Sequence, residues 1–450
     1  MIHFTAAPNI SGFIEKTITD HTEEWKKMLK EGDLYGFERS MFTEFLNIYE
    51  SIASTFMQEV ATEISNKLAV DAKKLGARKV EVRPMRIRLG TGSEISVSSP
   101  YIKESKSKWK GNRHLLGAYW GTIGSASPFL YDKVGYSVAV GPSYNIANQT
   151  LDRFGTSISL SSTQDISNKI AAECSEFGEE NLMLEEGESL EDKRVIISID
   201  GGRTRTRKYN GKVNESKHPT YDTSWREPKL FVIDVIDNKG NIEKHKLPIY
   251  GVKFGEEDCI SLLERYLRKL KIEKAAEVQI IGDGAAWIWN RLPSLMERLK
   301  VGKTKLTETL DYYHSSSYVY ELVDFMPEEI AKEERKKHLE TFKEWLWNGK
   351  VDQIVMTCRK IFKHPCKEIN RKINYLGKHQ NRMQYAAYSK KKLMCGSGIV
   401  ESAIRRIINL RFKNTSTFWK EERVEKLFFL RAAVLSGRWN NVVQKLADRV

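Results

Sequence analysis

Two short apolar segments of the chain each end in an aspartate with glycine beside it. IISIDGG carries Asp200 and QIIGDGAAW carries Asp283. Each pattern predicts a buried strand that stops at the acid. In an α/β sheet the ends of neighbouring strands open into the crevice where ligands bind, and glycine leaves room for a ligand or a nucleic-acid backbone. Either aspartate alone is as readily a turn residue or a helix cap, but the two together repeat one arrangement.

Cationic residues crowd the chain directly after the first of these acids. A lone carboxylate at the end of an apolar strand is costly to desolvate. Either a cation binds the acid, or a polyanion lies across the neighbouring basic side chains. Those side chains are Arg203, Arg205, Arg207 and Lys208.

The region around the two acids predicts a mixed sheet with helices packed on its faces, because three successive strands are followed by alternating helix and strand. The predicted strands span 195–200, 229–237, 244–254 and 277–284, and the predicted helices span 256–271 and 286–299. Residues 321–394 are predicted to be helical and highly charged.

A third acid, Glu401, lies in CGSGIVESAIRRIINLRFK, within the first turns of a predicted helix that has an apolar stripe. Taken in isolation, Glu401 is better explained as an ordinary glutamate favoured by the helix dipole. Gly396 and Gly398, just before it, favour a close backbone contact instead.

Carboxylates that converge at strand ends repel one another unless a cation neutralises them. Mg²⁺ is the natural candidate, because it prefers hard oxygen ligands and keeps positions for water and phosphate. Two such ions can activate an attacking oxygen and stabilise a leaving one at phosphorus. The basic residues after Asp200, together with those after Glu401, would then hold a phosphodiester backbone. The second group comprises Arg405, Arg406, Arg411 and Lys413.

The composition favours a polyanionic partner, since 73 Lys and Arg residues outnumber 59 Asp and Glu residues and the pI is near 9.3. No apolar run approaches the roughly 20 residues needed to span a bilayer, so no membrane association is expected. The first residues do not match a signal peptide, which predicts a cytoplasmic protein. The five cysteines include no CxxC pair, so neither a disulfide framework nor a structural zinc site is indicated.

The first 190 residues predict a mostly helical region. Apolar residues at helical spacing occupy 14–75, and 79–102 alternates in twos, as a hairpin does. Residues 143–174 predict a helix, a break at Gly155 and a second helix that opens at Ser159, which is the outline of a helix-turn-helix and equally of a plain helical hairpin. The acidic segment 176–193 has the composition of a solvated linker, and a domain boundary is predicted there.

Several motifs together resemble the DDE transposases of bacterial insertion sequences, closest to the ISKra type and related to the Mutator-like group. They are ISIDGGRTRTR, REPKLFVIDVID, GDGAAWIW, LDYYHSSSYV and the segment from CGSGIVESAIRR to LSGRW, and they cover most of the chain from 195 to 440. The resemblance implies an RNase H-like catalytic core, with Asp200, Asp283 and Glu401 as the metal-binding triad. It also implies a helical insertion before the glutamate helix and a supporting role for His314 in DYYH.

The resemblance also bears on partners and on residues that would touch DNA. It implies Mg²⁺, with Mn²⁺ as a substitute, double-stranded DNA as element ends and target, and at least a dimer on DNA. Trp287 and Trp289 are expected in the core, whereas Trp419, in a basic setting, is the better candidate for base stacking. A nucleoid-associated, cytoplasmic location follows.

The expected fold class is a multidomain α+β protein, with an RNase H-like mixed α/β core, an all-helical insertion and a mostly helical N-terminal DNA-binding region. The predicted divisions are 1–78, 79–190, 191–320, 321–394 and 395–450. The predicted function is Mg²⁺-dependent cleavage and strand transfer of DNA. Two alternatives stay open, a non-catalytic DNA-binding regulator derived from a transposase and an RNase H-like structure-specific nuclease.

Overall fold

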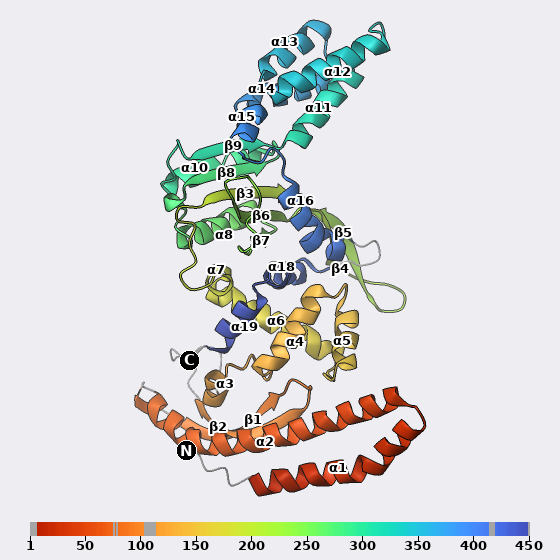
Figure 1. The fold of residues 1–450 in the computed structure, drawn as a ribbon, viewed down its shortest axis with the longest axis vertical. Helices are drawn as coiled ribbons and strands as arrows, with labels where there is room; N and C mark the ends of the chain where they lie inside the picture. The colour runs from red at the N-terminus through yellow and green to blue at the C-terminus, as the bar shows by residue number, and fades with distance from the viewer. Residues whose placement is uncertain (1–6, 75–76, 78–79, 103–113, 414–418, 449–450) are drawn as a thin grey trace. The chain divides into compact units, whose positions relative to one another are not determined.

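The computed structural model describes residues 7–74, 77, 80–102, 114–413 and 419–448 (Figure 1). The chain forms two compact units: unit 1 comprises Met1–Gly178 with Trp439–Val450, and unit 2 comprises Glu179–Arg438. Both units contain helices and strands, and unit 2 contains a mixed sheet, as a multidomain α+β fold requires. The five divisions expected from the sequence stay a prediction.

Unit 1 is mainly helical. Its elements are α1 (Ala7–Lys30), α2 (Leu34–Lys74), β1 (Val80–Arg88), β2 (Glu94–Ile102), α3 (Leu115–Tyr119), α4 (Pro128–Val140), α5 (Tyr144–Arg153), α6 (Leu160–Phe177) and α19 (Trp439–Ala447). The strands β1 and β2 pair antiparallel, and apolar side chains that alternate along them, including Ile87 and Val97, pack with Ala61 of α2. The predicted N-terminal helices and hairpin are confirmed. The segment 103–113, which is rich in lysine, lies outside the described residues.

The pair α5 and α6 has the predicted outline. Gly155 adopts a φ of +76° in the turn between the helices, a conformation that L-residues rarely adopt. The Ser159 hydroxyl then accepts a hydrogen bond from the Ser162 amide and caps α6. The break at Gly155 and the second helix from Ser159 are confirmed, and their use in DNA recognition stays a prediction.

The acidic segment at 176–193 is not a solvated linker, and that prediction is wrong. Glu179 and Glu180 are buried in the short helix α7 (Glu179–Met183) and pair with Lys253 and Arg265. Glu179 lies 74 residues from Lys253 in the sequence, so the acidic composition alone could not reveal a partner that only the fold brings close.

Unit 2 holds a five-stranded sheet in the order β7-β6-β3-β8-β9. Its strands are β3 (Arg194–Gly201), β6 (Lys229–Ile236), β7 (Ile249–Lys253), β8 (Glu277–Gly282) and β9 (Leu306–Leu310). β6 runs antiparallel to β3 and β7, whereas β3, β8 and β9 are parallel. Every residue of β6 is buried, as expected of a strand covered on both faces. The predicted mixed sheet is confirmed, and its third strand is shorter than the predicted 244–254.

Helices of unit 2 both precede and follow β8 in the sequence. They are α8 (Glu256–Lys269), α9 (Ala286–Trp289), α10 (Leu292–Arg298), α16 (Gly398–Ile404), α17 (Leu410–Phe412) and α18 (Glu421–Leu435), with short 3₁₀ turns at Ile272–Lys274 and Gln380–Arg382 and a π-helical turn at Arg405–Asn409. α8 packs against β6 and β7, and α16 packs against β3 and β6.

A two-stranded hairpin, β4 (Thr204–Val213) with β5 (Pro219–Arg226), stands between β3 and β6 in the chain and forms its own sheet, drawn as a separate ribbon in Figure 1. The sequence prediction missed it. The alternation in TRTRKY and TYDTSWR carried the strand signal, but the density of charge there was read only as a binding surface.

The predicted helical insertion is confirmed as helical. It comprises α11 (Tyr312–Asp324), α12 (Lys332–Trp347), α13 (Val351–Ile361), α14 (Lys367–His379) and α15 (Tyr385–Lys390). Lys372 of α14 is 2% exposed, and its ammonium pairs with Glu321 of α11. No described helix has an apolar stretch of the length needed to cross a membrane.

Buried polar contacts fix the chain where it returns from these helices to the sheet. The Gln279 side chain on β8 donates to the Met394 carbonyl (2.6 Å) and accepts from the Met394 amide (3.0 Å). The Asp311 carboxylate, 2% exposed, accepts hydrogen bonds from the amides of His314 (2.6 Å) and Ser397. The segment that leads into α16 is therefore tied to β8 and to the end of β9.

Replacement of Asp311 by alanine should detach this connection. Asp311→Ala leaves two backbone amides without their acceptor and should lower the stability of unit 2 by about 2 to 4 kcal/mol. Hydrogen exchange at His314 and Ser397 measures the loss. Asp324→Ala, at the exposed far end of α11, is the matched control and should change little. Equal effects of the two substitutions would contradict the role given to Asp311.

Candidate active site

The two aspartates meet at one edge of the sheet. β3 and β8 are parallel neighbours, and Ile199 lies opposite Gly282 in their register. Asp200 and Asp283 are the next residues on the two strands, so the structure brings them together as their sequence pattern predicted. Asp200 Oδ1 accepts a hydrogen bond from the Gly201 amide (2.6 Å), and Asp283 Oδ1 accepts one from the Ala285 amide (2.9 Å).

The electrostatics of this edge are unfavourable for a negative charge. Burial, followed by the charges of Asp283, Glu401 and Glu227, raises the pKa of Asp200 from 3.8 to about 7, against the opposing Gly201 hydrogen bond. Three carboxylates from separate parts of unit 2 therefore oppose the charge of Asp200. Such a cluster takes up a proton or binds a cation.

Glu401 lies in the first turn of α16 and its side chain is exposed. The helix and the π-helical turn after it approach the sheet closely, because a Cβ on Gly202 would lie 2.6 Å from a methyl group of Ile408. Glu401 is within electrostatic reach of Asp200. In the described part of the chain, however, no three His, Cys, Asp or Glu side chains are arranged as a metal site. The aspartates thus converge, and Glu401 stands near them without joining a common ligand set.

Glu227 is a member of this cluster that the sequence reasoning missed. It precedes β6, and its carboxylate accepts a hydrogen bond from Lys229 Nζ (2.5 Å). A Cβ on Gly201 would lie 2.2 Å from Glu227 Oε1, so the glycine beside Asp200 gives this side chain its room. The acid in REPKLF at the start of a predicted strand was the available signal.

His314 is exposed in the first turn of α11, beside an aromatic group that borders Asp283. Its ring centroid lies 5.6 Å from that of Tyr318 and 6.3 Å from that of Tyr375. Tyr375 of α14 fills the space beside Gly284, and burial, followed by Tyr318 and Asp283, raises the pKa of its phenol. The structure thus places His314 at the margin of the acidic edge, and Tyr375 is a neighbour that the sequence pattern did not reveal.

The predicted DNA-binding residues divide into two groups. Six have exposed or half-exposed side chains: Arg203, Arg205, Arg207, Lys208, Arg405 and Lys413. Arg406 is also exposed, and its guanidinium donates to the Tyr250 hydroxyl (2.9 Å). The side chains of these seven residues are accessible to solvent, and their role as DNA contacts stays a prediction.

Arg411 and Trp419 are buried, at 2% and 6% exposure, so their prediction as DNA contacts is wrong. The Trp419 ring packs at 5.3 Å from Phe412, the Arg411 guanidinium lies 5.3 Å from the Trp419 ring, and Trp419 forms a β-bridge with Thr206. Long-range pairing with β4 buries the indole, which its polar local sequence did not show. Trp287 and Trp289 are buried, as predicted.

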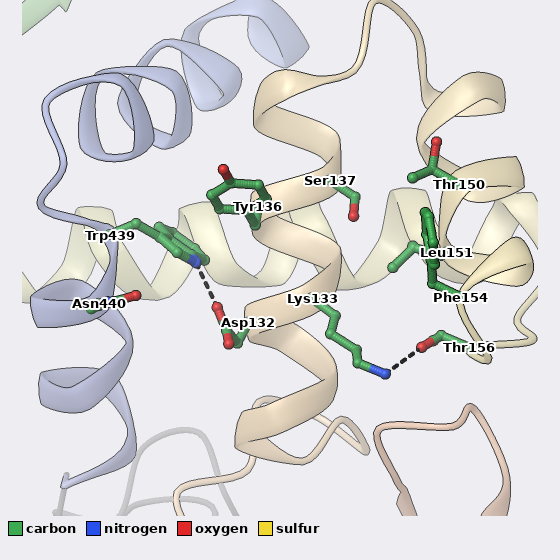
Figure 2. Close-up of a pocket in the computed structure, with 10 residues that line it drawn as sticks. All are labelled: Asp132, Lys133, Tyr136, Ser137, Thr150, Leu151, Phe154, Thr156, Trp439 and Asn440. Carbon is green, nitrogen blue, oxygen red and sulfur yellow. Dashed lines mark hydrogen bonds between the residues drawn. The ribbon is translucent and has the colours of Figure 1, made fainter. Parts of the chain in front are cut away.

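A separate cavity of about 300 Å³ lies within unit 1, lined by residues of α4, α5 and α19 (Figure 2). Lys133 donates there to the Thr156 hydroxyl (2.9 Å), and Asp132 accepts from the Trp439 indole (2.7 Å). These polar groups bind one another, and the cavity lacks the paired carboxylates of unit 2 among its lining residues.

Comparison with known proteins adds little. No family model and no curated protein matches the chain. Among solved structures, the Drosophila P element transposase strand transfer complex is similar at 12% identity and a TM-score of 0.26, over 72% of this chain and 82% of that one. A likeness this slight carries no argument about fold or function.

The raised pKa of Asp200 has a consequence for stability. The folded state binds the proton more tightly than the unfolded state, so this group makes stability fall as pH rises from about 4 to 7. Asp200→Asn removes the loss, and the variant should be more stable than the parent at pH 8 by a few kcal/mol, on the order of 1.4 kcal/mol per pKa unit. The gain should vanish near pH 4. Hydrogen exchange of the buried β3 amides measures it.

Asp324→Asn, an exposed aspartate in the same unit, serves as the control and should show no such pH-dependent gain. If Asp200→Asn is no more stable than the parent at pH 8, the raised pKa of Asp200 is contradicted.

Proposed function

We propose that this chain is a DNA transposase that cleaves DNA strands at element ends and transfers them to target DNA by a DDE mechanism. One observation carries the proposal. Asp200 and Asp283 follow neighbouring parallel strands, and both Asp283 and Glu401 raise the pKa of Asp200. Acids separated by up to 201 positions in the sequence thus share one electrostatic environment at a sheet edge.

The sheet supports an RNase H-like core for unit 2. Its first strand along the chain, β3, is central; β6 lies antiparallel beside β3 and β7 antiparallel beside β6, and β8 and β9 lie parallel to β3 on the other side. The helices α11 to α15 intervene between the last strand and the glutamate helix, where the resemblance in sequence expects an insertion. The π-helical turn after Glu401 adds support, because such turns occur frequently at functional sites.

The donor set suits Mg²⁺, or Mn²⁺ in its place, because Asp200 and Asp283 offer hard oxygen atoms and their mutual repulsion favours a cation. These two would hold the metal, and Glu401 would complete the set. When bound, the metal would activate an attacking oxygen and stabilise a leaving one at phosphorus. The exposed guanidinium groups of Arg203 and Arg405 would hold the phosphodiester, and His314 would support the edge beside Asp283.

The partners and location follow from this proposal. Double-stranded DNA would bind as two element ends and a target, which requires at least a dimer of this chain on DNA. The excess of basic residues supports a polyanionic partner. The protein would act in the cytoplasm, associated with the nucleoid.

One observation favours a second candidate, a DNA-binding regulator without catalysis. Among the described residues, Asp200, Asp283 and Glu401 do not form a joint ligand set. A site that has lost its catalytic activity would also lack such a set. A third candidate, a structure-specific nuclease, uses the same acids. Products of strand transfer separate it from a transposase, and metal-dependent nicking separates both from a regulator.

Cleavage should depend on both aspartates. With DNA that flanks the reading frame as substrate, Asp200→Asn and Asp283→Asn should each reduce Mg²⁺-dependent nicking by about a thousandfold or more while binding is kept. EDTA should abolish nicking by the parent protein, and Asp324→Asn should nick like the parent. Nicking that survives in Asp200→Asn would remove Asp200 from the site; nicking without joined products would favour the nuclease.

Metal binding should also be visible without any reaction. At pH 8, Mg²⁺ about a hundredfold above its Kd should stabilise unit 2 by about 2.7 kcal/mol, because only the folded chain brings the acids together. The gain should shrink at pH 5.5, where a proton occupies Asp200. Asp283→Asn should lose it and Asp324→Asn should keep it, as measured by thermal unfolding. An equal gain in all three proteins would exclude this edge as the metal site.

A further inference from the structure

The hairpin of β4 and β5 presents one face with an unusual mixture of side chains. Arg205 pairs with Trp225 across the strands, and Tyr209 pairs with Tyr221. Side chains alternate along a strand, so residues two apart share a face. We call this the outer face of the hairpin; it consists of Arg203, Arg205, Arg207, Tyr209, Tyr221, Thr223 and Trp225.

The opposite face and one edge fix the hairpin at its root. Thr204 and Thr206 are buried, and the Thr204 hydroxyl donates to the Phe412 carbonyl (3.2 Å). The Arg207 amide donates to the Trp419 carbonyl (2.8 Å). The amide of Gly202 closes the base by donating to the Pro228 carbonyl (2.8 Å). The outer face is thus held at a fixed position beside the sheet.

Arginines lie against the aromatic rings of the outer face. The Arg203 guanidinium is 5.3 Å from the Trp225 ring centroid, and that of Arg207 is 4.4 Å from the Tyr221 ring centroid. Trp225 and Tyr209 are each 51% exposed. Trp225 and Tyr209 thus expose aromatic surface that a partner can cover.

The charge of the hairpin identifies the class of that partner. Residues 203–226 contain seven Lys and Arg residues and two acidic residues, which favours a polyanion. Phosphate contacts with a duplex need cations but not aromatic rings. Exposed rings interleaved with arginines are typical of sites for unpaired strands, where bases stack on the rings and the arginines meet the phosphates.

The hairpin is joined directly to the acidic edge. Arg203 is three residues beyond Asp200, which is about 10 Å of extended chain, and β5 ends at Arg226, one residue before Glu227. A strand that lies on the root of the outer face would therefore pass beside Asp200.

We propose that the outer face of the hairpin binds an unpaired DNA strand and presents it to the acidic edge. The choice of DNA over RNA rests on the proposed function; the stacking site itself rests on the hairpin. Bound there, bases would stack on Trp225 and Tyr209 while arginines pair with the flanking phosphates, so the strand to be cut is held apart from its complement.

Binding of oligo(dT) of about 15 nucleotides, in EDTA at fixed salt, tests this site. Trp225→Ala should weaken that binding about tenfold, while affinity for a blunt duplex changes by less than about twofold. Trp225→Phe keeps a ring and should restore most of the affinity. Tyr320→Ala, which removes an exposed aromatic ring from α11, is the matched control and should bind like the parent.

Three outcomes would overturn the proposal. In the first, Trp225→Ala has the circular dichroism spectrum of the parent and binds oligo(dT) with unchanged affinity. In the second, Trp225→Ala loses affinity for duplex and single-stranded DNA equally. In the third, the parent protein binds oligo(U) more tightly than oligo(dT). The binding assay contains EDTA, so its result does not depend on metal-dependent cleavage. The proposal of a strand-binding face can therefore fail while cleavage still depends on Asp200, and it can hold even when no cleavage is found.

Discussion

The parallel pairing of β3 with β8 is the constraint on which the rest of unit 2 depends. It places Asp200 and Asp283 at one edge, where burial and the charge of Asp283 oppose the ionisation of Asp200. A sheet that needed only stability would have neutral residues there. The surrounding groups follow from this conflict: glycines beside each acid leave space, and Lys229 neutralises Glu227. This edge therefore lowers the stability of the fold while it gathers carboxylates around Asp200.

Local sequence signals were sufficient for the central strands and for the aspartate pair. A short apolar run that stops at an acid indicates both a buried strand and the end of that strand. Pairing of the two neighbouring strands then brings the two aspartates together. Signals failed where burial depends on a distant partner. Trp419 has polar neighbours in sequence and is covered by β4, and Glu179 belongs to an acidic run and is covered by Lys253. Composition describes the average of a segment, whereas the fold buries only particular residues of that segment.

The approach of Glu401 depends on residues that no acidic pattern indicates. Gln279 is fully buried in β8 and satisfies both backbone groups of Met394, and Asp311 caps α11 while it holds Ser397. Loss of either side chain would leave buried backbone groups without partners, so the start of α16 is fixed strongly. Glu401, one turn later, stays exposed. The helix is thus anchored at its beginning, with its carboxylate in water at the margin of the acidic edge.

The two acid-bearing elements are also joined through the hairpin. β4 begins four residues after Asp200, and its Thr206 pairs with Trp419, which packs on Phe412 at the end of the helical segment that carries Glu401. Arg411 and Trp419 therefore belong to the buried contact between the hairpin and this helical segment. Because a packed core transmits strain, a displacement of the hairpin would be transmitted through these buried contacts to the helical segment that carries Glu401. The hairpin and the helical segment that carries Glu401 therefore share one packed contact around Trp419.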